Sequence, residues 1–257
     1  NYDENGQYNL QEAYNTNANN IDELYSDSQN KAGTYLRSSI NNHYWYGGLS
    51  TLNYQVANEI LLSGGLDMRY YKGQHYQEVY DLLGADYVAD NDYSKGASQI
   101  QMTEVKRIGD KVGKDYEGIV KWSGVFSQAE YSNGIVSAFL NISASNSAYK
   151  KIDYFKKKDL VLEDTTLLQV LETSQDTEIE YDNSGTPISA HKTMVADTFW
   201  YNGHSYTINS PEARLSESDW KWIRGHTIKA GTNVNLDDRN NVFFNVGFIS
   251  KAPLFKN

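Results

Sequence analysis

Three pairs of long, alternating segments are the feature of this sequence that most constrains its fold. Within each pair, apolar and polar residues alternate along the chain, and only a few turn residues separate the two segments. Because neighbouring side chains of a β-strand point to opposite faces, this alternation predicts strands with one apolar and one polar face. Residues 35–72, 119–149 and 219–252 are therefore predicted to form three antiparallel hairpins with about six long strands.

The second segment of the first pair shows the alternation most clearly. It reads ILLSGGLDMRY over residues 60–70, so that apolar side chains fall on one face and mostly polar or charged ones on the other. In the second pair, Asn133-Gly134 separates the two segments, and Asn-Gly between alternating runs is the strongest short-range hairpin signal. The other two turns are predicted at residues 57–59 and 237–240.

The connections between the hairpins are long and polar. Residues 1–34, 73–118 and 150–218 lack sustained periodicity and are predicted to be loops. Long strands with short turns at one end and long loops at the other are typical of outer-membrane barrels, whereas soluble sandwiches have strands of about five or six residues. The predicted fold is thus all-β: antiparallel strands of part of a transmembrane outer-membrane β-barrel. The turns would be periplasmic, and residues 73–118 and 150–218 extracellular.

Composition excludes several classes of protein. The 257 residues include no Cys, which excludes disulfide frameworks, thiolate metal sites and cysteine nucleophiles. A net charge of −10 argues against nucleic acid as the main partner. No uninterrupted apolar run approaches the roughly 20 residues that a membrane helix needs. Neither an initiator Met nor a signal peptide opens the chain, so Asn1 is expected to begin a processed or excised piece.

The sequence predicts no catalytic, cofactor or metal site. No Gly-x-Ser-x-Gly motif is present, and Gly47-Gly48 and Gly64-Gly65 lie inside predicted strands, where glycine allows close backbone approach rather than phosphate binding. The histidines are scattered without metal-ligand spacing, at His43, His75, His191, His204 and His226.

Charged runs in the connecting segments are interpreted mainly as solvated loops. Asp159–Asp182 holds eight carboxylates and no Lys or Arg, so divalent-cation binding is the alternative there. Residues 156–158 are three lysines, which would meet either solvent or anionic headgroups. Asp90-Asn91-Asp92 and Asp237-Asp238 are interpreted as turn residues rather than calcium ligands.

Several charges fall inside predicted strands, where a charge that faces lipid is costly. These charges are Asp67, Arg69, Lys121, Glu130, Arg224 and Lys229. In a barrel most of them must face the lumen, where structural pairing with other protein groups is expected more often than direct contact with substrate. Aromatic residues near strand ends would fit interfacial girdles, at Tyr44, Trp45, Tyr46, Tyr54, Tyr70, Tyr71, Tyr131, Tyr149, Trp220 and Trp222. Loop starts rich in tyrosine would suit stacking against sugars, at Tyr70, Tyr71, Tyr76 and Tyr80.

Five blocks occur in this order over roughly residues 35–257: NNHYWYGGLSTLNYQV, GGLDMRYYKGQHYQEVYDLLG, WSGVFSQAEYSNG, YKKIDYFKKKDLVL and SDWKWIRGHTIKAGTNVNLDDRNNVFFNVGFISKAP. Together they resemble the barrel of a TonB-dependent outer-membrane receptor. The closest likeness is to the Bacteroidota type, which often carries an N-terminal carboxypeptidase-regulatory-like domain.

The resemblance implies a 22-stranded barrel with a separate N-terminal plug domain, which imports a scarce nutrient with energy from the inner-membrane TonB complex. Nothing in the sequence resembles the TonB box, the regulatory-like domain or the plug, so the chain is expected to be one section of the barrel. Its implied partners are its own plug domain, the remaining barrel strands, the TonB complex, outer-membrane lipid and, in some systems, a surface lipoprotein. The resemblance implies no cofactor.

Two other classes of function stay open. One is a secreted or surface β-sandwich module that binds carbohydrate, which solubility without detergent would favour. The other is a β-rich hydrolase, disfavoured because no nucleophile–base or paired-acid constellation emerges. Glycan fragments, ferric chelates, cobalamin-like compounds and peptides all travel through the resembled family, so the sequence does not identify a substrate.

Overall fold

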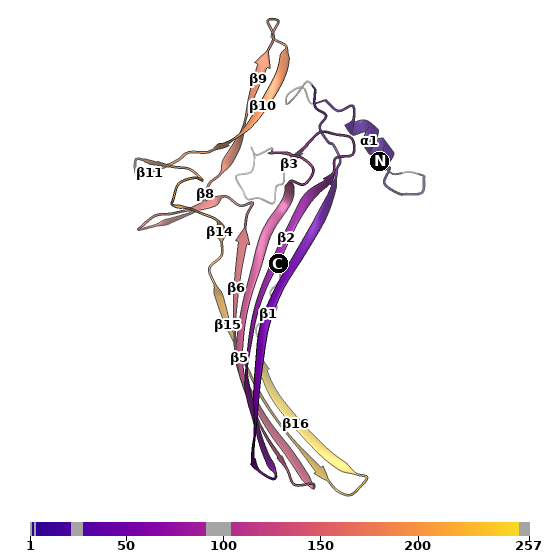
Figure 1. Ribbon diagram of the computed structural model, residues 1–257, viewed down its shortest axis with the longest axis vertical. Helices are drawn as coiled ribbons and strands as arrows, with labels where there is room; N and C mark the ends of the chain where they lie inside the picture. Colours follow the sequence, from indigo (N-terminus) through magenta and orange to yellow (C-terminus); the bar gives the residue numbers. More distant parts are fainter. Residues whose placement is uncertain (1, 3, 22–27, 91–103, 252–257) are drawn as a thin grey trace. The chain divides into compact units, whose positions relative to one another are not determined.

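The computed structural model describes residues 2, 4–21, 28–90 and 104–251. Within these residues the structure consists of β-strands with one short helix, and its sheets are antiparallel (Figure 1). The predicted all-β, antiparallel class is therefore confirmed. In the described part of the chain, no helix has the length and apolar character needed to cross a membrane.

Six long strands, in the order β1-β2-β5-β6-β15-β16, form the main sheet together with the short β14 (Ser216–Glu217), which pairs with β6. Their bounds are Leu36–Ala57 for β1, Ile60–Asp81 for β2, Lys111–Ser132 for β5, Val136–Asp153 for β6, Lys221–Asn235 for β15 and Asn241–Ser250 for β16. They make three hairpins whose turns fall where Asn-Gly and the other turn residues predict them. Within the described residues the sheet is open, with β1 and β16 as its edge strands.

The chain divides into two compact units, and the division runs through the long strands. The first, here called the core unit, comprises Asn1–Asn42, Gln74–Glu117 and Ile152–Glu217. The second, here called the strand unit, comprises His43–Gly73, Gly118–Lys151 and Ser218–Asn257.

The core unit has a buried apolar centre of the kind found in soluble domains. Val79 from β2 and Val112 from β5 are fully or almost fully buried there. They pack with Ala32, which precedes β1, with Leu82, which follows β2, and with Val88 of the short strand β3 (Val88–Asp90). The turn after β2 places Leu82 inward, and Leu83 and Gly84 complete it with positive φ angles. Burial of these side chains supplies the hydrophobic stabilisation of the unit.

A helix in the N-terminal segment corrects the prediction that residues 1–34 form only a loop. Helix α1 (Leu10–Asn17) begins after Asn9, whose side chain accepts a hydrogen bond from the Glu12 amide at 3.0 Å and so caps the helix. At its other end the buried Asn17 amide donates to the carbonyls of Thr34 and Leu82, at 2.7 and 2.9 Å. These bonds hold the helix on the unit, which local periodicity could not reveal.

Strands also extend into the two segments predicted to be long loops. Strand β2 continues to Asp81 and β5 begins at Lys111, so both overlap residues 73–118. That segment also contains β3 (Val88–Asp90) and β4 (Glu104–Lys106). Residues 150–218 contain the end of β6 and eight shorter strands: β7 (Lys158–Val161), β8 (Thr166–Leu171), β9 (Thr173–Tyr181), β10 (Pro187–Ala196), β11 (Phe199–Tyr201), β12 (His204–Tyr206), β13 (Ala213–Arg214) and β14 (Ser216–Glu217). Short strands of mixed polarity give little period-two signal, which is why the sequence suggests loops.

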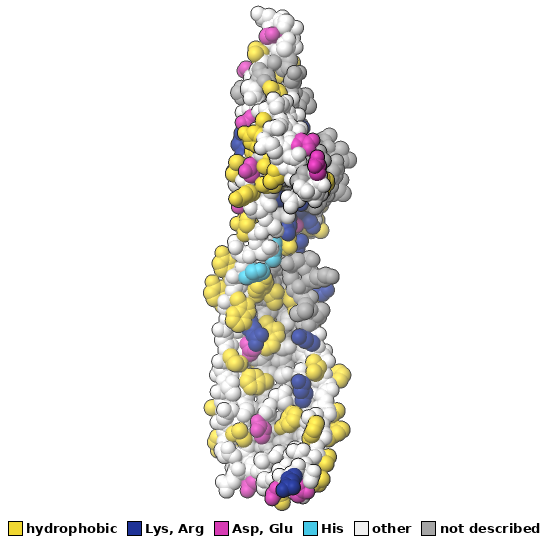
Figure 2. Space-filling view, turned by 90° about the vertical axis from the view of Figure 1, so that its right-hand side faces the viewer, with side chains coloured by type: hydrophobic (Ala, Val, Ile, Leu, Met, Phe, Trp, Pro, Cys, Tyr) yellow, Lys and Arg dark blue, Asp and Glu magenta, His cyan; other side chains and the backbone are white. Residues whose placement is uncertain are grey.

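The strand unit has the opposite arrangement to the core unit, because its apolar side chains are the exposed ones. In β6, Leu140 and Ile142 are 44% and 48% exposed, while Asn141 and Ser143 between them are half-buried. Figure 2 shows hydrophobic side chains at the molecular surface, among polar ones and separate charges. The alternation predicted from the sequence is thus present, and its apolar side has no cover in the described structure.

The strand register brings these exposed side chains into rows across neighbouring strands. Ile228 of β15 lies opposite Ile142 on one side and Phe248 on the other. Ala230 lies in the same way between Leu140 and Val246. We call this side of the strand unit the apolar face and the opposite side the polar face.

Candidate functional site: the polar face of the strand unit

Side-chain contacts between neighbouring strands define the polar face of the strand unit. Asn141 of β6 donates to Gln128 of β5 at 3.1 Å, and Arg69 of β2 lies 5.0 Å from the ring centre of Trp122 of β5. Because alternate residues share a face, the polar face carries the odd-numbered residues of β2, β6, β15 and β16 and the even-numbered residues of β5.

Arg69 forms the main charged group of this face. Its Nε donates to Asp67 Oδ1 at 3.0 Å and its Nη2 donates to Asp67 Oδ2 at 2.5 Å, which makes a bidentate pair two residues apart on one strand. The Arg69 side chain remains about half exposed while it lies over Trp122. A fixed guanidinium beside an indole ring is suited to binding polar, ring-shaped or anionic ligands.

A chain of amides lies further along the polar face. Gln128 accepts from Asn141 and donates to Glu130 Oε1 at 2.5 Å, so three strand residues are joined by hydrogen bonds. Gln128 and Glu130 border an open hollow of about 520 Å³, which also has Phe139, Phe243 and Asn245 in its lining. Amide, carboxylate and aromatic groups around one hollow can hydrogen-bond and stack against a polar ligand.

Two glycines of this face lie beneath aromatic rings. A Cβ at Gly231 would come within 2.5 Å of the Phe139 ring, and one at Gly65 within 2.6 Å of the Phe126 ring. Gly64-Gly65 therefore provides the close approach expected from the sequence. The sequence does not show which ring covers which glycine, because the partners come from neighbouring strands.

The histidines are dispersed over the fold. His43 and Tyr71 pair at 2.6 Å between Nδ1 and the hydroxyl, in the strand unit, whereas His75 is buried in the core unit against Tyr116. His226 belongs to the apolar face, where it stacks on Phe248. His191 lies in β10 and His204 in β12. Among the described residues, no group of three or more His, Asp or Glu side chains is placed to hold a metal ion.

The in-strand charges divide between the two faces. Asp67, Arg69, Glu130 and Lys229 lie on the polar face. Lys121 and Arg224 lie on the apolar face, because Arg224 is in register with Asn146 and Lys121 follows the odd-numbered positions of β5. Four of the six charges thus share the polar face, and Lys121 and Arg224 are the exceptions.

The tyrosine-rich segment does not form one stacking platform. All four tyrosines lie within strand β2 rather than in a loop. Tyr70 and Tyr71 are neighbours and point to opposite faces, with Tyr70 beside Tyr46 and Tyr71 beside His43. Tyr76 belongs to the core unit, where the Lys111 ammonium lies 4.5 Å from its ring centre.

The acidic run lies mostly in strands β7, β8 and β9 rather than in a loop, and most of its carboxylates are exposed to solvent, as predicted. Asp159 is buried in β7 and accepts from the Gln169 amide at 2.8 Å. Asp182 accepts from the Ser184 hydroxyl and the Thr186 amide, and these hydrogen bonds hold the pKa of its carboxyl below the ordinary value. In the preceding lysine run, Lys157 pairs with Glu172 at 2.6 Å.

Asp237 performs the turn role predicted for it. Asp90 of the other predicted turn instead lies in strand β3 and is buried, which corrects that prediction, while Asn91 and Asp92 lie outside the described residues. The Asp237 carboxyl accepts from the Asn240 side chain and from the Arg239 and Asn240 amides. These hydrogen bonds, with Asn240 first, lower the pKa of Asp237.

The β15–β16 turn is therefore expected to loosen in acid. A carboxyl whose pKa is lowered by folding stabilises the folded state above its unfolded-state pKa, and this contribution disappears as the pH falls through the lower, folded-state pKa. Hydrogen exchange of the Arg239 and Asn240 backbone amides should accelerate only at pH values below the ordinary pKa range of aspartate. Asp237→Asn keeps a hydrogen-bond acceptor but removes the charge, so it should abolish this dependence of amide exchange on pH. A titration midpoint of Asp237 at or above the usual aspartate value would contradict the prediction.

The chain matches no protein-family model, no curated protein and no solved structure. Its function is therefore inferred from the geometry of the strand unit. That unit provides an extended polar surface with a bidentate Arg69–Asp67 pair, an amide chain and aromatic rings, on the reverse side of an exposed apolar surface.

Proposed function

We propose that the strand unit is a section of a transmembrane β-barrel in an outer membrane, of the TonB-dependent receptor type, and that it serves nutrient uptake rather than catalysis. The observation that carries this proposal is the exposure pattern of β6, in which Leu140 and Ile142 are exposed while Asn141 between them is half-buried. A sheet in water hides its apolar face, whereas a barrel wall presents that face to lipid and its polar face to the lumen.

The length of the apolar stretch also supports a membrane wall. Ile60 to Tyr70 covers ten residue steps of about 3.4 Å, which at the tilt of about 40° usual for barrel strands gives a height of about 26 Å. The apolar band of outer-membrane barrels is about 25 Å tall.

The edge strands support a sheet that continues into further strands. Within the strand unit, both faces of β1 from residue 43 to 57 and of β16 from residue 241 to 249 are exposed, with Leu52 at 75% and Phe243 at 71%. Edge amides and carbonyls have no water to satisfy them in hydrocarbon, so a membrane wall requires neighbouring strands at both edges. The remaining barrel strands are the proposed neighbours. The plug domain and the transported nutrient would lie on the polar face, with the TonB complex as the energy source.

Labelling at adjacent positions tests the membrane wall directly. The chain has no native Cys, so Leu140→Cys and Asn141→Cys each give one site for an environment-sensitive fluorophore. In the complete barrel reconstituted into phosphatidylcholine vesicles, with this chain together with its neighbouring strands, nitroxide-labelled lipid should quench the label at position 140, and aqueous iodide should quench the label at position 141. A protein that stays in buffer as a stable monomer, with both labels unaffected by lipid, would instead be the soluble carbohydrate-binding sandwich.

A further inference from the structure

One end of the apolar face carries Lys and Arg side chains, whereas the rest of this face carries uncharged side chains. Lys121 of β5 lies 4.5 Å from the ring centre of Trp220, and Lys150 of β6 lies 5.8 Å from the same ring. Arg224 of β15 is exposed on the same face, in register with Asn146. We call Lys121, Lys150, Arg224 and Trp220 the basic patch.

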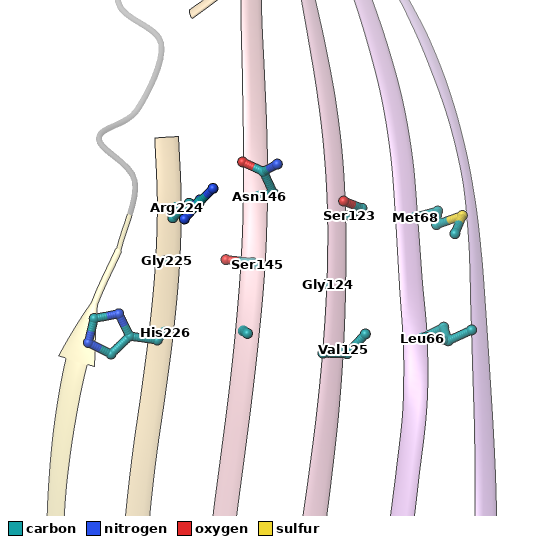
Figure 3. A pocket seen from close by; sticks show the side chains of 11 residues that line it. Leu66, Met68, Ser123, Gly124, Val125, Ser145, Asn146, Arg224, Gly225 and His226 are labelled. Carbon is teal, nitrogen blue, oxygen red and sulfur yellow. The ribbon is translucent and has the colours of Figure 1, made fainter. Parts of the chain in front are cut away.

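The basic patch adjoins an open pocket on the apolar face. The pocket has a volume of about 550 Å³, and Arg224 and Asn146 are in its lining beside Leu66, Met68 and Val125. Figure 3 shows Ser123, Asn146 and Arg224 at one level on three adjacent strands, with the apolar side chains of Met68 and Leu66 on the next strand. A polar row thus borders apolar side chains within one pocket.

The side chain of Asn146 is a second, independent observation that favours a polar ligand beside Ser123 and Arg224. Its Oδ1 atom is buried and has no hydrogen-bond partner in the described structure. A buried acceptor without a partner costs free energy, which a hydroxyl or another donor at this level would recover. The guanidinium of Arg224 and the hydroxyl of Ser123 are the charged and polar groups beside it in the pocket.

We propose that the basic patch binds the anionic phosphate headgroup of a membrane lipid, with the acyl chains along the apolar face. This inference rests on the proposed membrane wall and adds the class of lipid that the wall selects. Two cations around an indole are complementary to a phosphodiester, because the cations pair with the phosphate oxygens and the indole nitrogen prefers the headgroup region. Polar atoms of the headgroup, such as glycerol hydroxyls, would reach the free acceptor of Asn146.

The position of the patch along the strands suits this ligand. His226, Ile228 and Ala230 follow Arg224 on the same face of β15, so the charge stands at one end of an apolar series. A cation at the end of an apolar stretch lies at the depth of lipid headgroups, where Lys and Arg are favourable, rather than at the midplane, where they are costly.

Lipid binding by the protein in neutral detergent micelles tests the proposal. Phosphatidylglycerol is titrated and the retained lipid counted by native mass spectrometry, for the parent and for Lys121→Gln, Arg224→Gln and the double variant. A cation near an anionic headgroup contributes about fivefold in affinity, so the double variant should bind roughly 30-fold more weakly. Lys229→Gln is the matched control, since Lys229 lies on β15 but on the polar face, and it should leave binding unchanged.

Three further measurements distinguish a lipid site from a folding defect and from a site for free phosphate. Lys121→Arg with Arg224→Lys keeps both charges and should restore binding, which a loss of folding in the Gln variants would not allow. Uncharged diacylglycerol should not be retained, and inorganic phosphate should not compete. Equal binding of diacylglycerol, full competition by inorganic phosphate, or equal loss in Lys229→Gln would overturn the proposal. If the label at position 140 inserts into lipid while the basic-patch variants bind phosphatidylglycerol normally, only the lipid-site inference is wrong. If that label stays in water, the proposed membrane wall is wrong.

Discussion

In the proposed membrane wall, replacement of Leu140 by arginine is expected to lower the free energy of unfolding in a bilayer by about 2–4 kcal/mol, the range for Arg near the midplane of outer-membrane barrels. Leu140 is exposed on the apolar face, in register with Ala230, so an arginine there would place its charge against lipid in that wall. Unfolding by denaturant in vesicles measures the change.

The matched control is the same replacement one residue later. Asn141 lies on the polar face and donates to Gln128, so Asn141→Arg loses one hydrogen bond but keeps its charge away from lipid. Its effect should be far smaller than that of Leu140→Arg. Equal losses at both positions would contradict a lipid-facing apolar side.

A second large effect is expected from a single added methyl group at Gly65. The Cβ of an alanine there would collide with the backbone carbonyl oxygen of Ser50 and come within 2.6 Å of the Phe126 ring. A backbone atom cannot move aside without disturbing the β1–β2 pairing, so Gly65→Ala should cost about 1–3 kcal/mol, as overpacking does elsewhere. Denaturant unfolding under the same conditions gives the value.

Gly48 provides the comparison for this change on the neighbouring strand. No atom outside its chain neighbours lies within 4 Å of a Cβ built at Gly48, so Gly48→Ala should leave stability unchanged or raise it slightly. If the two alanine variants lose the same stability, the collision at Gly65 is not the cause of the loss.

The alternation of apolar and polar residues is sufficient to predict the long strands, their hairpin turns and which side chains share a face. These properties are local, because the two faces of a strand follow from residue parity and a turn from a few adjacent residues. Residue parity alone therefore assigns Leu140 and Asn141 to opposite faces. The Asp237 turn is predictable for the same reason.

The core unit cannot be predicted in this way. Val79 and Val112 meet across two strands, and Asn17 bonds a carbonyl 65 residues away, at Leu82. Such partners are distant along the chain, and a short strand or an eight-residue helix leaves too few positions for a periodic signal. The connecting segments thus resemble loops in sequence although they contain the buried centre of the unit.

The strand class, the hairpins and the separation of polar and apolar side chains onto two faces each depend on residues within a few positions of one another, so they can be predicted without the structure. The residues that meet between strands are visible only in the folded chain: Phe126 above Gly65, Arg69 above Trp122, and Lys121 beside Trp220. The tertiary structure also placed Lys121 and Arg224 on the apolar face. These contacts between strands join different hairpins, so they depend on the register between strands that are distant along the chain, which the turn residues of a single hairpin do not fix.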